Sequence, residues 1–149
     1  TISRYTASGI DQQVDYEKFY LYSLITHSTA IEGSTVTEVE NQLLFDEGIA
    51  AKGRSLNEQM MNVDLKNAYL YGFEWAKTGQ PYSVELLCEL SAKVMRRTGS
   101  EYSTMGGSFD SSKGELRRCN VSAGIGGRSY LAFQKIPKAT ADFCDWLNG

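Results

Sequence analysis

The first two thirds of the sequence form a succession of helical segments, each with its own start and stop signals, and this succession constrains the fold most. From Val14 to Ile31, apolar and aromatic side chains recur at helical spacing, and neither Gly nor Pro interrupts them. Gly33 follows, where a helix commonly ends in a left-handed residue. The spacing therefore predicts a helix over 14–31 with Gly33 as its C-terminal cap.

Capping signals predict three further helices. A Ser or Thr followed three residues later by an acidic residue matches the capping box, in which both side chains satisfy free amides at a helix start. Such pairs, or a single capping serine, occur at Thr35 with Glu38, at Ser55 with Glu58, and at Ser83. We expect the helices that follow to end at Gly48, to span 56–77, and to run to about residue 97.

The character of the sequence changes after residue 98. Between 99 and 115, Gly, Ser, Asp and Thr predominate and neither helical nor strand periodicity is visible, which predicts a long loop. Segments 116–122 and 128–134 flank a glycine-rich stretch, a pattern typical of a β-hairpin.

A last helix is predicted over 137–148. Pro137 suits its first turn, and we expect Phe143, Trp146 and Leu147 to form its buried face. The sequence thus predicts a mainly α fold, a helical bundle with one β-hairpin.

Composition and charge argue against several classes of protein. The net charge is -3 and the basic residues are scattered along the chain, which disfavours a nucleic-acid surface. Three widely spaced cysteines and a single histidine predict neither a disulfide framework nor a zinc site. Because no apolar run is long enough to span a bilayer and no secretory signal is visible, we expect a cytoplasmic protein without a membrane partner.

The end of the first predicted helix carries a short motif. Residues Ser28 to Gly33 read Ser-Thr-Ala-Ile-Glu-Gly and fit the pattern Ser/Thr-x-x-x-Glu-Gly/Asn, with Glu32 at the acidic position. Further on, Gly-Glu-Leu-Arg at 114–117 leads into the glycine-turn hairpin, and an aromatic helix ends in Trp-Leu-Asn. In motif and in the order of its segments, the chain from about Tyr16 onward resembles the N-terminal half of Fic (Fic/Doc) family AMP-transferases that carry an inhibitory helix.

The resemblance implies a regulated protein adenylyltransferase. In this family the glutamate equivalent to Glu32 pairs with an arginine that otherwise binds the γ-phosphate of ATP, so that AMP transfer to a protein Ser, Thr or Tyr hydroxyl stops. Ser28 resembles the hydroxyl residue of the motif, which anchors the helix. The implied parts are an N-terminal extension (1–13), an inhibitory helix (14–33), a helical core (34–98), a loop (99–115), a flap hairpin (116–134) and a helix (137–148).

The flap of such proteins holds a target segment by β-augmentation, in which an extended segment adds to an exposed strand edge. The residues of this sequence that correspond to that edge are Asn120, Val121, Ser122, Ser129, Tyr130 and Leu131.

The catalytic signature of the family, His-x-Phe-x-Asp/Glu-Gly-Asn-Gly-Arg-x-x-Arg, does not occur in these residues. The one histidine, His27, falls inside the first predicted helix, and the glycine-rich stretch 124–127 lacks the Lys-Ser/Thr of a P-loop. We therefore assign no catalytic residue and no metal ligand here, and expect the signature to lie beyond Gly149. The resemblance implies ATP and Mg²⁺ as cofactors of the full-length protein, and we do not expect either to bind tightly to this part. Self-association of the chain is a possible further interaction.

A second interpretation is a non-catalytic helical binding module that inhibits a separate catalytic chain, as antitoxins of this family do. The motif residues Ser28 and Glu32 could also have purely structural roles. Ser28 could bond to the preceding turn of its own helix, and Glu32 could be a solvated glutamate at a helix end where the dipole disfavours negative charge.

Overall fold

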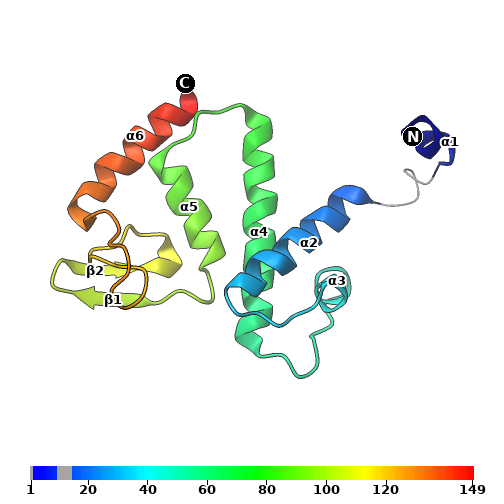
Figure 1. Cartoon of the computed structure of the whole chain (residues 1–149), viewed down its shortest axis with the longest axis horizontal. Coiled ribbons are helices and arrows are strands. Elements are labelled where there is room, and N and C mark those ends of the chain that lie inside the picture. Colours follow the sequence, from blue (N-terminus) through cyan, green and yellow to red (C-terminus); the bar gives the residue numbers. More distant parts are fainter. Residues whose placement is uncertain (1, 10–14) are drawn as a thin grey trace. The chain divides into compact units, whose positions relative to one another are not determined.

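The computed structural model describes residues 2–9 and 15–149 (Figure 1). Its helices and strands, in chain order, are α1 (Ile2–Ala7), α2 (Tyr16–Ile31), α3 (Glu38–Glu47), α4 (Leu56–Thr78), α5 (Val84–Val94), β1 (Glu101–Thr104), β2 (Gly107–Asp110), the 3₁₀ turns η2 (Ser111–Lys113) and η3 (Phe133–Lys135), and α6 (Ile136–Asn148). The chain divides into two compact units, Thr1–Lys66 and Asn67–Gly149. The prediction of a mainly α fold with a β-hairpin is confirmed.

In the first unit, α2 packs against α3 through Tyr22, which makes both a polar and an aromatic contact. The hydroxyl of Tyr22 donates to Asp46 at 2.6 Å, and Lys18 forms an ion pair with the same carboxylate at 2.6 Å. The Tyr22 ring meets Phe45 edge to face at 4.9 Å between centroids. The buried apolar residues of this unit include Ile25 and Val36.

The start of α3 differs from the prediction by two residues. Thr37, not Thr35, is the N-cap, and it forms a capping box with Glu40. Thr35 is unavailable as a cap because its N–H and its hydroxyl both donate to Glu58, a residue of α4. The predicted end of this helix at Gly48 is confirmed, since Gly48 has the left-handed conformation with φ 70°.

The predicted starts of α4 and α5 are confirmed at the level of single hydrogen bonds. The Ser55 hydroxyl accepts from the Glu58 N–H at 3.2 Å while the Glu58 carboxylate accepts from the Ser55 N–H at 3.0 Å. The Ser83 hydroxyl accepts from Leu86 N–H at 3.1 Å. α5 ends at Val94, a few residues before the predicted end. The part of the predicted first helix at Val14 lies outside the described residues, as does most of the junction between the predicted N-terminal extension and α2.

The long loop predicted over 99–115 is wrong in part, because it contains the antiparallel sheet β1–β2. The register pairs Tyr102 with Phe109, and the two rings stack at 5.0 Å between centroids. Phe109 is buried. The strands are only four residues long and otherwise polar or glycine, so the one aromatic pair that holds them together leaves no periodic pattern in the sequence.

Gly114 ends the turn after this hairpin at the surface of α5. It is buried, its φ is 71°, and a Cβ built on it would lie 1.9 Å from the carbonyl oxygen of Cys88. Only glycine combines this conformation with so close an approach to the α5 backbone. The turn η2 consequently packs closely on α5.

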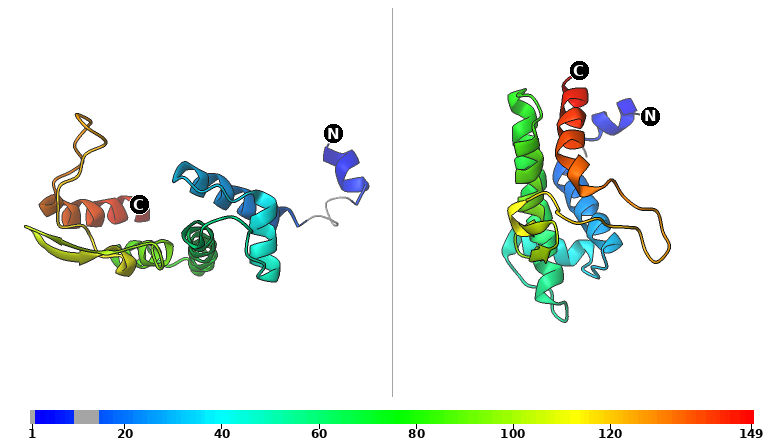
Figure 2. Two further views of the ribbon diagram at one scale, coloured as in Figure 1. Left: turned by 90° about the horizontal axis from the view of Figure 1, so that it is seen from below. Right: turned by 90° about the vertical axis from the view of Figure 1, so that its left-hand side faces the viewer.

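The hairpin predicted over 116–134 is reduced to a single antiparallel bridge between Ser122 and Ser129. The turn itself lies where predicted, since Ala123 N–H donates to Arg128 O and Tyr130 N–H to Val121 O, both at 3.0 Å. The rest of the segment is irregular because its legs carry few apolar side chains that could be buried on one face. Figure 2 shows it as a loop extending away from α6. We refer to residues 119–132 as the flap.

The last helix, α6, begins with Pro137 in its first turn, as predicted, and lies beside α5. The prediction of its buried face is wrong. Cys144 is the buried residue, whereas Phe143, Trp146 and Leu147 are 47%, 74% and 37% exposed, and the rings of Phe143 and Trp146 stack on each other at 5.9 Å. The helix contacts α5 through the face that carries Cys144, so the described residues leave the aromatic face uncovered.

Candidate functional site

The motif at the end of α2 forms a tight helix terminus. Gly33 N–H donates to Ala30 O and Ser34 N–H donates back to Thr29 O, both at 3.0 Å, the bond pattern of a Schellman motif. Gly33 supplies the positive φ, 93°, that this reversal requires. Glu32 is therefore held at the very end of the helix by main-chain bonds on either side.

The helix end rests on a buried polar network that joins α2, α3 and α4. Its members are polar residues in the interior of the first unit: Thr26, Thr29, Ser34, Asn41 and Asn62. Asn41 Nδ2 donates to Thr26 Oγ1 and to Asn62 Oδ1, both at 2.9 Å. The network therefore connects three helices through directional bonds instead of apolar packing alone.

Asn62 is the centre of this network. Its Oδ1 accepts from Thr29 Oγ1 at 2.8 Å as well as from Asn41, and its Nδ2 donates to Ser34 Oγ at 3.1 Å and to the Glu58 carbonyl at 2.8 Å. An asparagine side chain offers two acceptor and two donor positions, and all four are used here. Because Thr29 and Ser34 stand on either side of Glu32 and Gly33, Asn62 fixes the position of the motif.

A second, more exposed cluster holds the chain that leaves the motif. The carboxylate of Glu58 accepts from the N–H and hydroxyl of Thr35 at 2.8 and 2.7 Å, and from the N–H and hydroxyl of Ser55 at 3.0 and 2.7 Å. Arg54 joins the same cluster by donating to Thr35 Oγ1 at 3.0 Å and to Glu40. The hydrogen bonds from Ser55 and Thr35 lower the pKa of Glu58 to about 2.

This cluster predicts that the protein loses stability in acid. Because the pKa of Glu58 is lowered on folding, its bonds stabilise the protein fully above its ordinary pKa of about 4.5, and that stability is lost as the pH falls from there towards about 2. The free energy of unfolding, measured by denaturant titration from pH 6 to pH 2, should fall less steeply for Glu58→Gln than for the unchanged protein. Parallel slopes for the two proteins would contradict the assignment. Glu47→Gln, at an exposed carboxylate at the end of α3, is the matched control.

The side chain of Glu32 differs from those of Glu40 and Glu58. Glu32 is exposed, and within the described part of the chain its carboxylate forms no hydrogen bond or ion pair. Ser28, one turn earlier on the same face, is half-buried. The first unit thus presents an unoccupied carboxylate on a rigid support, an arrangement suited to accepting donors from another segment.

The six predicted flap residues lie on the two legs of the flap in the second unit. All of them are exposed. The bridge bonds use the main chain of Val121 and Tyr130, and Asn120 Oδ1 accepts from Phe133 N–H at 3.0 Å. The motif and the flap belong to different units.

Arg117 ties the base of the flap together. Its guanidinium donates to the carbonyl oxygens of Cys119, on one leg, and of Leu131, on the other. A planar guanidinium with several donors suits this bridging position. Sequence reasoning placed Arg117 in a motif but missed this role, which depends on two legs that meet only in the folded chain.

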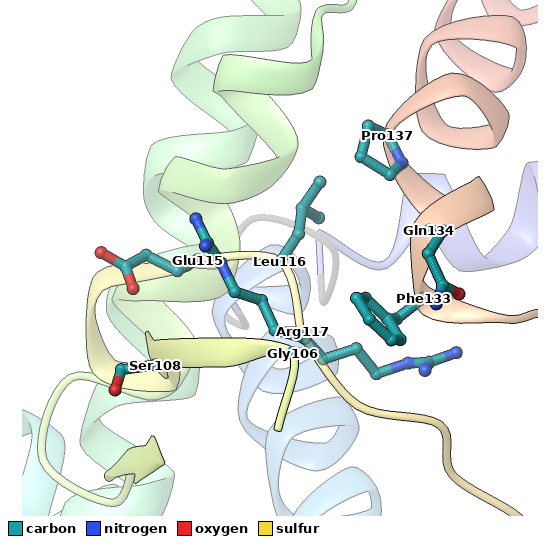
Figure 3. A pocket seen from close by; sticks show the side chains of 9 residues that line it. Gly106, Ser108, Glu115, Leu116, Arg117, Phe133, Gln134 and Pro137 are labelled. Carbon is teal, nitrogen blue, oxygen red and sulfur yellow. The ribbon is translucent and has the colours of Figure 1, made fainter. Parts of the chain in front are cut away.

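A cavity of about 590 Å³ lies at the base of the flap (Figure 3). Figure 3 shows Phe133, Gln134 and Pro137 on one side, opposite Glu115 and Ser108. Arg117 and Arg118 also line the cavity, so residues from both ends of the flap form its walls.

Three features of the described residues bear on metal and nucleotide binding. The described residues contain no group of three His, Cys, Asp or Glu side chains that could hold a metal ion. His27 is exposed, and its Nε2 lies 3.1 Å from Glu38 Oε1. The glycine-rich stretch 124–127 leads into the return leg of the flap and not into a helix, so it does not form the phosphate cradle of a P-loop.

Comparisons with known proteins place the fold. No protein-family model and no curated protein matches the sequence. The structure is similar to that of Fic-1 (residues 134–508) from C. elegans, with a TM-score of 0.60 and 18% sequence identity. The match covers 87% of this chain and 35% of the other, so the chain spans about a third of that structure. Among the described residues, no helix is both long and apolar enough to cross a membrane. The chain therefore has the fold of a part of Fic-1.

Proposed function

We propose that this chain is the regulatory and target-binding part of a Fic-type protein adenylyltransferase, which transfers AMP from ATP to a Ser, Thr or Tyr hydroxyl of another protein. The observation that carries the proposal is the free Glu32 carboxylate at the end of a helix fixed by buried hydrogen bonds. The similarity of the fold to Fic-1 supports it, and so does the Ser28 to Gly33 motif at this helix end.

Inhibition would work through competition for one guanidinium. An arginine from outside these 149 residues binds the γ-phosphate of ATP through charge-assisted, bidentate hydrogen bonds when it is free. The Glu32 carboxylate takes these donors and repels the phosphate. When the arginine no longer holds the γ-phosphate, the α-phosphate is not aligned for in-line attack by the target hydroxyl. This alignment is most of what such an enzyme supplies to the reaction.

The binding of ATP and Mg²⁺ is assigned to residues outside this sequence. The described residues offer no group of acidic or imidazole ligands for a metal and no glycine-rich helix start for phosphates. The role of this chain is to hold Glu32 in place and, through the flap, to hold the target segment.

Replacing Glu32 with glutamine is expected to raise AMP transfer about ten- to a hundredfold in a protein that carries this chain together with the catalytic signature. The substitution keeps the shape of the side chain and removes the charge, and a hydrogen bond to a charged group contributes about 1.5 to 3 kcal/mol. The measurement is incorporation of label from α-labelled ATP into protein at saturating ATP.

Glu47→Gln is the matched control, because Glu47 is also an exposed carboxylate at the end of a helix. It should leave transfer unchanged. If Glu32→Gln and Glu47→Gln behave alike, Glu32 has no inhibitory role.

A further inference from the structure

The flap and its flanks are the basic part of an acidic chain. Between Leu116 and Lys138 the sequence contains five basic residues and no acidic one, although the whole chain has 15 basic and 18 acidic residues. Two of the five have partners, since Arg117 bonds to carbonyl oxygens and Lys138 pairs with Asp142 at 2.8 Å. Arg118, Arg128 and Lys135 form no ion pair within the described part of the chain.

Arg118 combines its free charge with a partly apolar surrounding. It lines the cavity at the base of the flap, together with Leu116, Phe133 and Pro137. Its guanidinium lies across Gly107, where a Cβ built on the glycine would come within 3.1 Å of Nη1. Glu115 also lines the cavity and keeps its negative charge, but its carboxylate accepts from Asp110 N–H at 2.7 Å and points away from Phe133 and Gln134 (Figure 3). Arg118 is exposed, so water partly screens a charge pair formed there, and the apolar residues beside it reduce that screening.

The flap also has free main-chain groups on both outer edges. Its internal bonds use the peptide groups of Val121, Ala123, Arg128 and Tyr130. In an antiparallel pair the intervening residues direct their N–H and C=O groups outward, so Ser122 and Ser129 present these groups to an added strand. An extended segment paired with Ser122 would reach Arg118 within about four residues, at roughly 3.3 Å per residue.

We propose that the flap binds an acidic, extended segment of the target protein, with its main chain on the flap edge and an Asp or Glu side chain in the cavity on Arg118. The inference rests on the proposed function and defines its substrate class. The free edge favours a polypeptide over a nucleic acid, because a nucleic acid has no pattern of peptide groups to pair with it.

The test measures peptide binding without nucleotide. Two short fluorescein-labelled peptides, each with a central serine, carry either Glu or Gln about four residues to both sides, and their binding to the 149-residue chain is followed by anisotropy. The Glu peptide is expected to bind about tenfold more tightly at low salt, which corresponds to about 1.4 kcal/mol, and the difference should shrink as salt is added.

Three variants distinguish a specific role of Arg118 in the cavity from a general effect of positive charge. Arg118→Gln should abolish most of the preference for Glu over Gln, and Arg118→Lys should keep part of it because the charge remains without the bidentate geometry. Arg96→Gln removes an exposed arginine outside the basic segment and should preserve the preference. Circular dichroism of each variant verifies that the fold is retained.

Three results would overturn the proposal: equal binding of the two peptides, an undiminished preference in folded Arg118→Gln, or competition by single-stranded DNA as effective as that by the Glu peptide. Failure of the proposed function gives a different pattern. The preference for the Glu peptide would then be present, but the protein carrying the catalytic signature would not label that peptide with AMP.

Discussion

The substitution Asn62→Ala is expected to lower the free energy of unfolding of the first unit by about 3 to 5 kcal/mol. It removes one side chain that satisfies Thr29, Asn41 and Ser34 at once, all of them buried. The substitution removes four hydrogen bonds, each of which contributes about 0.5 to 1.5 kcal/mol, and the buried volume that the side chain leaves empty adds to the loss. Denaturant unfolding followed by circular dichroism measures the loss.

Asn67→Ala is the matched control, since Asn67 is exposed on the same helix. Alanine favours a helix more than asparagine does, so this variant should be as stable as the unchanged protein or slightly more stable. Amide hydrogen exchange supplies a local measurement: Asn62→Ala should expose the N–H of Ser34 and Gly33 before the rest of α2. Equal stability of the two variants would mean that the network does not hold the helix end.

The substitution Gly114→Ala is expected to destabilise the second unit by about 2 to 4 kcal/mol. The new methyl group would overlap the Cys88 carbonyl of α5, and forcing extra atoms into a packed site costs about 1 to 3 kcal/mol. The positive φ adds a strain of about 1 kcal/mol or more for a non-glycine residue. A thermal melt should show a correspondingly lower midpoint.

Gly124→Ala separates the two causes. Gly124 has nearly the same backbone conformation, φ 70°, but nothing lies within 4 Å of the Cβ that would be added. It should therefore cost only the conformational strain of about 1 kcal/mol. If the Gly114 variant lost no more than the Gly124 variant, the close approach of the turn to α5 would not contribute to stability.

Helix ends could be predicted from the sequence where their signals are local. The bonds of Ser55 with Glu58, of Ser83 with Leu86, and the left-handed turn at Gly48 all lie within a few residues, so the sequence alone indicates them. Thr35 shows the limit. Its spacing to Glu38 is that of a capping box, but its hydroxyl donates to the carboxylate of Glu58 in α4 and does not cap α3.

The strands of the chain differ from the prediction for a related reason: the flap forms one bridge in place of a hairpin, and β1–β2 lies in the predicted loop. The glycine-rich stretch gives a strong local turn signal, and a turn does form there, but it lacks the buried pairs that extend a bridge into strands. The short sheet β1–β2 has such a pair in Tyr102 and Phe109, and these residues meet only because the chain reverses between them.

The sequence predicted the position of the motif at the end of the first helix, but it did not predict the buried polar network that holds this helix end. Glu32 and Gly33 lie at the helix end that the pattern indicates. Thr29, Asn41 and Asn62 are polar residues inside helices, and sequence reasoning assigns such residues to the solvent face. Polar residues that recur on the expected inner side of several helices are the signal that would have found them.

The hydrogen bonds around Asn62 also determine how the end of α2 can move. Apolar side chains tolerate sliding, because one methyl group replaces another at little cost, whereas the four bonds of an amide match their partners in a single register. A shift of α2 by one turn, about 5.4 Å, would break the hydrogen bond from Thr29 to this amide and the bond from the amide to Ser34, which follows the helix. We therefore expect the end of α2 to be either held by these hydrogen bonds or released from them.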